Sequence, residues 1–74
     1  MKLKILLETK TDALDLIKIA SLLDDEITLT DGKGMVVSAK SFLGTLYAKF
    51  EFTEIWLESK NDHYLEFSKF AAEE

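Results

Sequence analysis

Asp31-Gly32-Lys33-Gly34 separates a segment in which apolar and polar side chains alternate from a short apolar segment. In the first segment, residues 26–30, Ile27 and Leu29 lie on one face. The second segment, Met35-Val36-Val37, follows the glycines. Asp-Gly between two segments with strand-like composition is a strong signal for a tight β-hairpin turn. We expect type I′, because Gly adopts positive φ freely and Asp tolerates it. The sequence therefore predicts an antiparallel pair of strands near the middle of the chain.

Segments with strand or helix periodicity surround this hairpin. Alternating side chains indicate strands over residues 2–8 and 53–58. Between the first strand and the hairpin, apolar side chains recur at helical spacing to about residue 23. The hydroxyl of Thr9 or Thr11 would cap the start of this helix.

A last helix is expected at the end of the chain. Asn61-Asp62 precedes an apolar stripe made of Tyr64, Phe67 and Ala71. Side-chain oxygens of Asn and Asp accept hydrogen bonds from the first N–H groups of a helix. The pattern predicts a helix over residues 63–72 that those three side chains pack against the core.

A further helix begins at Ser41, directly after the hairpin, and Ser is a favoured N-cap residue. Its large apolar side chains are spaced i, i+1, i+4 and i+5 and form one broad stripe: Phe42, Leu43, Leu46 and Tyr47. Gly44 costs roughly 1 kcal/mol relative to Ala inside a helix. This cost indicates close packing or a contact surface at Gly44. We expect residues 49–52 to connect this helix to the next strand.

The order of elements is β-α-β-β-α-β-α, within a single domain that spans residues 1–74. It predicts an α+β fold, a two-layer, open-faced β-sandwich. Three helices would cover one face of a four-stranded, mostly antiparallel sheet.

The charge and composition narrow the class of partner. A net charge of −5 argues against nucleic acids and anionic membranes, because like charges repel. The chain has no Cys, which excludes thiolate metal sites and fits a reducing compartment. No apolar run approaches the ~20 residues of a membrane-spanning helix. We expect a cytoplasmic protein without metal or cofactor. Its acidic surface either contacts a basic protein or only keeps the chain in solution.

The order of elements resembles that of HPr, the histidine-containing phosphocarrier family of the bacterial sugar phosphotransferase system. The residues that carry the resemblance are Glu26-Ile27-Thr28-Leu29-Thr30, Asp31-Gly32-Lys33, Ser38-Ala39-Lys40-Ser41, Phe42-Leu43-Gly44, Glu54-Ile55-Trp56-Leu57 and Asn61-Asp62. Motif identity is concentrated in the middle of the chain, whereas the order of elements agrees over nearly all of it. The resemblance implies a bacterial protein with the open-faced sandwich described above.

The resemblance fails at the residues that carry the family's chemistry. HPr proteins have a Gly-aliphatic-His-x-Arg-Pro stretch before the first helix, and its His accepts a phosphoryl group. Here the stretch is Leu7-Glu8-Thr9-Lys10-Thr11-Asp12, which is shorter and has no His, Arg or Pro. A lysine with a pKa of ~10.4 is protonated near neutral pH and does not replace imidazole. We therefore expect a degenerate active-site loop at Thr9, Lys10, Thr11 and Asp12, and no enzyme activity.

The resemblance also implies roles for the helix at Ser41. Ser41 matches a serine that a dedicated kinase phosphorylates in HPr-like proteins of many Gram-positive bacteria, although a plain N-cap is the favoured explanation and is compatible with phosphorylation. Phe42, Leu43 and Leu46 match the apolar patch that contacts partners, although core packing is the alternative. One layer cannot bury the whole stripe, so we expect one or two of these residues to be exposed.

These matches imply a regulatory protein-interaction module. Its partners would be phosphotransferase-system or transcription-regulatory proteins, and weak self-association is a further expectation. A second interpretation is a fold relative with an unrelated binding or structural role. A third interpretation is a phosphocarrier whose nucleophile is displaced to His63, the only His of the chain. Its place at the start of a helix, away from the family's active-site loop, favours an exposed structural residue instead.

Overall fold

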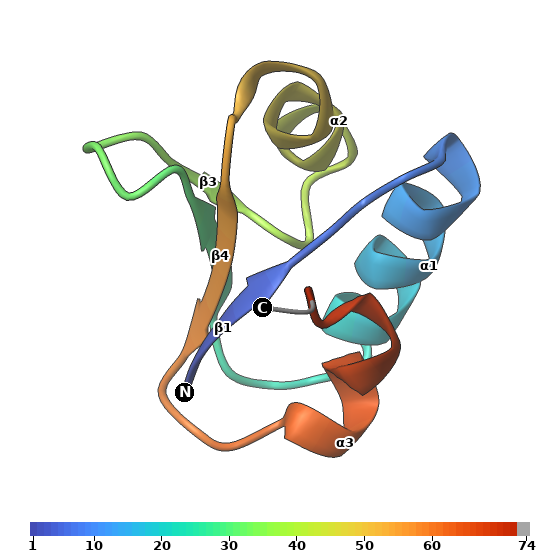
Figure 1. Ribbon diagram of the computed structural model, residues 1–74. Helices are drawn as coiled ribbons and strands as arrows, with labels where there is room; N and C mark the ends of the chain where they lie inside the picture. The colour runs from blue at the N-terminus through green and yellow to red at the C-terminus, as the bar shows by residue number, and fades with distance from the viewer. Residues whose placement is uncertain (73–74) are drawn as a thin grey trace.

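The computed structural model describes residues 1–72 and confirms the predicted α+β open-faced sandwich (Figure 1). Its elements are β1 (Lys2–Ile5), α1 (Lys10–Ser21), β2 (Ile27–Thr30), β3 (Val36–Ser38), α2 (Phe42–Glu51), β4 (Ile55–Ser59), α3 (Tyr64–Phe67) and the 3₁₀ turn η1 (Ser68–Phe70). The strands form one antiparallel sheet in the order β1-β4-β2-β3. The helices lie on one side of this sheet (Figure 1).

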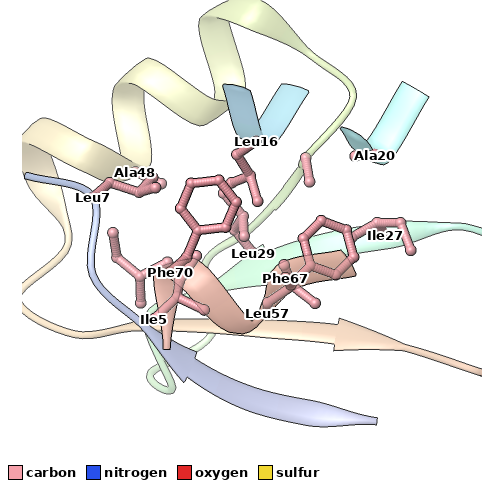
Figure 2. Close-up of a cluster of buried hydrophobic side chains, with 12 residues drawn as sticks. Ile5, Leu7, Leu16, Ala20, Ile27, Leu29, Ala48, Leu57, Phe67 and Phe70 are labelled. Carbon is pink, nitrogen blue, oxygen red and sulfur yellow. The ribbon is translucent and has the colours of Figure 1, made fainter. Parts of the chain in front are cut away.

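The core lies between the sheet and the helices. Alternate residues of each strand point toward the helices, so Leu29 and Leu57 are fully buried while Trp56 keeps part of its surface on the open face. Figure 2 shows the rings of Phe67 and Phe70 among the aliphatic side chains of the strands and of α1. Two large aromatic side chains from the last 12 described residues therefore fill the centre of the domain.

The segment after α3 also covers the outer edge of β1. The N–H of Leu6 donates to the carbonyl of Phe70 (2.8 Å), and the N–H of Ala72 donates to the carbonyl of Lys4 (2.9 Å). Ile5 and Ala71 form an antiparallel bridge between these bonds. One edge of the sheet is therefore closed by the chain itself.

The end of the chain corrects the prediction of a helix over residues 63–72. The α-helix stops at Phe67, because the segment that follows turns and pairs with β1. Phe67 is buried as predicted, but Tyr64 is half-exposed and Ala71 lies in the bridge to β1. Asp62 does support the start of the helix, because its Oδ1 accepts a hydrogen bond from the N–H of Tyr64 (2.9 Å).

The hairpin forms where it was predicted, but the prediction of a type I′ turn is wrong. Thr30 pairs with Val36, so five residues form the loop. Gly32 has a φ of +77°, whereas no residue other than glycine has positive φ within residues 1–72. Asp31 acts through its side chain instead, because its Oδ1 accepts hydrogen bonds from the N–H groups of Lys33 (2.7 Å) and Met35 (3.1 Å).

The expected connection over residues 49–52 is also wrong, because α2 continues to Glu51. No Pro or Gly follows Gly44 in this helix, and the N–H of Phe52 still donates to the carbonyl of Ala48 (3.0 Å). Phe52 packs against the core, whereas Phe50 stays exposed on the extra turn. This turn lengthens the apolar stripe that begins at Phe42.

Candidate functional site

Helix α2 is attached to β3 by a short joint with defined hydrogen bonds. Ser41 is the N-cap, as predicted, and its Oγ accepts a hydrogen bond from the N–H of Gly44 (3.1 Å). The N–H of Ser41 donates to the carbonyl of Ser38 (3.1 Å), which turns the chain from strand to helix. These bonds fix the direction in which α2 leaves the sheet.

Small residues bring α2 close to the sheet. Gly44, Thr45 and Ala48 face inward; Thr45 and Ala48 are buried, and Thr45 Oγ1 donates to the carbonyl of Ala39 (3.2 Å). A Cβ at Gly44 would lie 3.2 Å from Cβ of Val37. This tight approach explains the glycine that the sequence pattern indicated as a packing position.

The large side chains of α2 therefore project away from the core. We define the α2 apolar surface by its five residues, Phe42, Leu43, Leu46, Tyr47 and Phe50. Four of them are between 47% and 76% exposed, and Leu46 is partly buried. Of the three residues expected to contact a partner, Phe42 and Leu43 are therefore exposed, and Leu46 is the one that is partly buried.

The aromatic side chains at the end of this surface have ordered neighbours. The rings of Tyr47 and Phe52 meet edge to face, with centroids 6.0 Å apart. The ammonium of Lys49 lies 4.9 Å from the centroid of Phe50. An apolar centre with charged groups at its border is the usual anatomy of a protein-binding surface.

The four residues of the expected degenerate active-site loop form the start of helix α1 instead of a loop. Only Thr9 precedes α1, and Lys10, Thr11 and Asp12 form its first turn. Thr9 Oγ1 accepts from the N–H of Asp12 (3.1 Å), and Asp12 Oδ2 accepts from the N–H groups of Glu8 and Thr9 (both 3.1 Å). Thr9 is thus the cap, and the four residues close a capping box.

This capping box makes the start of α1 a poor place for a phosphoryl group. The carboxylate of Asp12 occupies N–H groups that an anion would otherwise approach. A negatively charged group brought here would be repelled by Asp12 and by the adjacent Glu8.

His63 has specific partners that sequence reasoning missed. Its Nε2 donates to Asp25 Oδ1 (2.7 Å), and its Nδ1 lies 3.4 Å from Glu66 Oε1. The hydrogen bond with Asp25 raises the pKa of His63 above its ordinary value of 6.5. Burial raises the pKa of Asp25, but hydrogen bonds from His63 and from the N–H of Asn61 outweigh burial and hold it below 3.8. The expectation of an exposed His63 is wrong, because its side chain is only 15% exposed.

The position of His63 does not suit a displaced nucleophile. Nε2 is engaged by Asp25, and Nδ1 faces the carboxylate of Glu66, whose negative charge would repel an anionic phosphoryl donor. Figure 1 places the start of α3 and the start of α1 at opposite ends of the helical layer. His63 and Thr9 therefore do not form one site.

Comparison with protein-family models, with curated proteins and with solved structures found no match to this chain. Within residues 1–72, no helix is long and apolar enough to cross a membrane. Four of the exposed large apolar side chains, those of Phe42, Leu43, Tyr47 and Phe50, lie on the single helix α2.

Proposed function

We propose that this chain is an HPr-like regulatory protein that binds a protein partner through the α2 apolar surface. The observation that carries the proposal is the exposure of Phe42, Leu43, Tyr47 and Phe50 on one helix. Fully burying a side chain of this size is worth roughly 1.5–3 kcal/mol. A partner that covers several of them gains a substantial part of its binding free energy from this helix.

We also propose that the protein transfers no phosphoryl group. The stretch that corresponds to the family's active-site loop has no His, and Thr9 and Asp12 form a capping box there that adds a negative charge. The one His of the chain is held between Asp25 and Glu66. Regulation by binding, rather than group transfer, fits both observations.

Phosphorylation of Ser41 would be the regulatory step that the resemblance implies. Ser41 is exposed and lies at the N-terminus of the ten-residue helix α2, next to Phe42 and Leu43. Negative charge is favourable at a helix N-terminus. A phosphate here would change the charge beside the apolar surface while leaving the fold in place.

The experiment compares two leucines that are both exposed. The immobilised wild-type protein, Leu43→Ala and Leu65→Ala are each incubated with lysate of the source organism, and captured proteins are quantified by mass spectrometry. Leu65 lies on α3 and is 86% exposed, so its loss matches the loss of Leu43 in size and polarity. The candidate partner is then purified, and its affinity is measured directly.

The expected result is a partner whose affinity falls for Leu43→Ala and stays unchanged for Leu65→Ala. A phosphotransferase-system or transcription-regulatory protein would support the HPr-like role. A partner of another class would support a fold relative with an unrelated binding role. Equal binding by both variants would contradict a role for α2.

A further inference from the structure

The backbone of β3 has groups that point away from the sheet. The N–H of Ala39 donates to the carbonyl of Ile27 (2.9 Å), and the N–H of Asp31 donates to the carbonyl of Met35 (3.3 Å). Hydrogen-bonded pairs alternate along an antiparallel ladder. Pairing with β2 therefore uses the backbone of Val37, whereas the backbone groups of Val36 and Ser38 point to the outer edge.

Only part of this outer edge is used by the chain itself. The carbonyl of Ser38 accepts from the N–H of Ser41. The N–H and carbonyl of Val36 and the N–H of Ser38 face a side of β3 on which no strand lies within residues 1–72. Two donors and one acceptor are therefore available in a row, at the spacing of an extended backbone.

The edge strand β3 is only three residues long, but it has neither charged residues nor Pro, two of the devices that commonly protect sheet edges. Residues 34–39 contain no charged residue and no Pro, and the side chain of Val36 is 60% exposed. The opposite edge, at β1, is closed by the segment that contains Ala71. The fold thus protects one edge of its sheet and leaves the other open.

We propose that β3 binds an extended segment of a partner protein, which adds to the sheet as a fifth strand. One residue of the segment would pair with both backbone groups of Val36, and a carbonyl two residues along would accept from Ser38 N–H. Main-chain hydrogen bonds of this kind supply affinity in strand addition, and alternate side chains supply specificity.

A second copy of this chain fits the edge less well than a foreign segment. Symmetric pairing about Val36 would place Ser38 opposite Gly34, whose φ of +111° is not extended. Symmetric pairing about Val37 would direct the Val36 N–H of each copy at the Ser38 carbonyl of the other, which Ser41 already occupies, and would leave both Val36 N–H groups unpaired. The charge of −5 on each copy adds repulsion.

The side chains beside the edge define the chemistry of the segment. Val36 lies on the open face next to Thr30, whereas Val37 faces the helical side, against the first turn of α2 at Gly44. An added strand would place alternate side chains beside Val36 and beside that turn. Uncharged, β-branched residues suit both positions, and basic residues at the ends would complement the acidic protein.

The test uses a labelled peptide and the full chain. The probe is a fluorescein-labelled nonapeptide in which valine and threonine alternate between terminal lysines. Its affinity for the wild-type protein, Val36→Pro and Val36→Thr is measured by fluorescence anisotropy. Proline removes the outward N–H of Val36 without breaking a bond to β2, and threonine keeps that N–H. Amide resonances of the wild-type protein are followed in parallel by NMR.

The expected result is a shift of the Val36 and Ser38 amide resonances and slower hydrogen exchange at both. Val36→Pro should bind about tenfold more weakly, and Val36→Thr within about twofold of wild type. If Val36→Pro does not fold, the proposal is tested by whether the peptide shifts the Val36 and Ser38 amide resonances of the wild-type protein. No binding at about millimolar peptide, shifts confined to other residues, or equal binding by a folded Val36→Pro would each overturn the proposal.

Discussion

Asp25 and His63, 38 positions apart in the chain, are joined by a hydrogen bond of 2.7 Å between Oδ1 and Nε2. The bond links the segment before β2 to the start of α3. Because α3 and η1 carry Phe67 and Phe70 into the core, this pair holds in place the segment that completes the domain. Its contribution to stability must depend on the charge of both groups.

The first prediction is a pH-dependent effect of His63→Gln. The raised pKa of His63 means that its contribution is full below pH ~6.5 and is lost as the pH rises through the folded-state value. The lowered pKa of Asp25 means that its contribution is present above pH ~4 and is lost as the pH falls through its folded-state value. The stability difference between wild type and His63→Gln should therefore be largest between about pH 4 and 6.5.

Urea unfolding at several pH values measures this difference. Asp15→Asn serves as the control, because Asp15 pairs with Lys69 at 3.4 Å on a more exposed surface. A difference for His63→Gln that stays constant from pH 5 to pH 9 would show that the ion pair does not hold α3.

The second prediction separates the two threonines at the start of α1. Thr9→Ala removes the cap and should cost about 0.5–2 kcal/mol of stability. Thr11→Ala should leave the free energy of unfolding nearly unchanged, because Thr11 lies inside the first turn and is exposed. Chemical denaturation of both variants checks this, and equal losses would argue against the capping box.

The third prediction concerns the hairpin. Gly32→Val should destabilise the protein by roughly 1–3 kcal/mol, because the φ of +77° is unfavourable for a β-branched residue. Lys33→Val, at the exposed neighbouring position, introduces the same side chain without a positive φ and should have little effect. Thermal unfolding of the two variants gives the comparison. A Gly32→Val protein as stable as Lys33→Val would contradict the loop conformation.

The fourth prediction tests the absence of phosphoryl transfer. Incubation with phosphoenolpyruvate and the phosphotransferase-system enzyme I should leave no acid-labile phosphate on this protein. An HPr that has its active-site His is the positive control in the same reaction. A label that appears on the wild-type protein and disappears in His63→Ala would establish the displaced nucleophile instead.

Local patterns predicted the fold class and most element positions. Alternation marked the strands, and the Ser41 cap identified the start of α2 correctly. For α1 the sequence left Thr9 and Thr11 as equal candidates, because each is a hydroxyl close to an acidic residue. Only the three-residue spacing from Thr9 to Asp12 closes the capping box.

Two of the errors arose where distant contacts override local preference. The last helix ends early because residues 71–72 pair with β1, whose sequence is at the other end of the chain. The contact between Asp25 and His63 has no local signature for the same reason. At the hairpin, Asp-Gly signalled a turn correctly, but the Asp31 side chain stabilised a longer loop than the two-residue type.

At the candidate site, the spacing of apolar residues after Ser41 predicted an apolar stripe on the helix. It did not predict which residues of the helix are buried in the core. Gly44, Thr45 and Ala48 decide this, because their small side chains allow α2 to lie close to β3 and turn the large ones outward. Phe50 was missed because α2 was expected to end before it.

The most direct measurement is the effect of Phe42→Ala on stability and on partner binding together. Phe42 is half-exposed, so the free energy of unfolding should fall by no more than about 0.5 kcal/mol while partner binding weakens. Phe67→Ala is the core control and should cost about 3–5 kcal/mol. If Phe42→Ala costs as much stability as Phe67→Ala, Phe42 is part of the core rather than of a binding surface. If it leaves partner binding unchanged, the proposed role of the α2 apolar surface is contradicted.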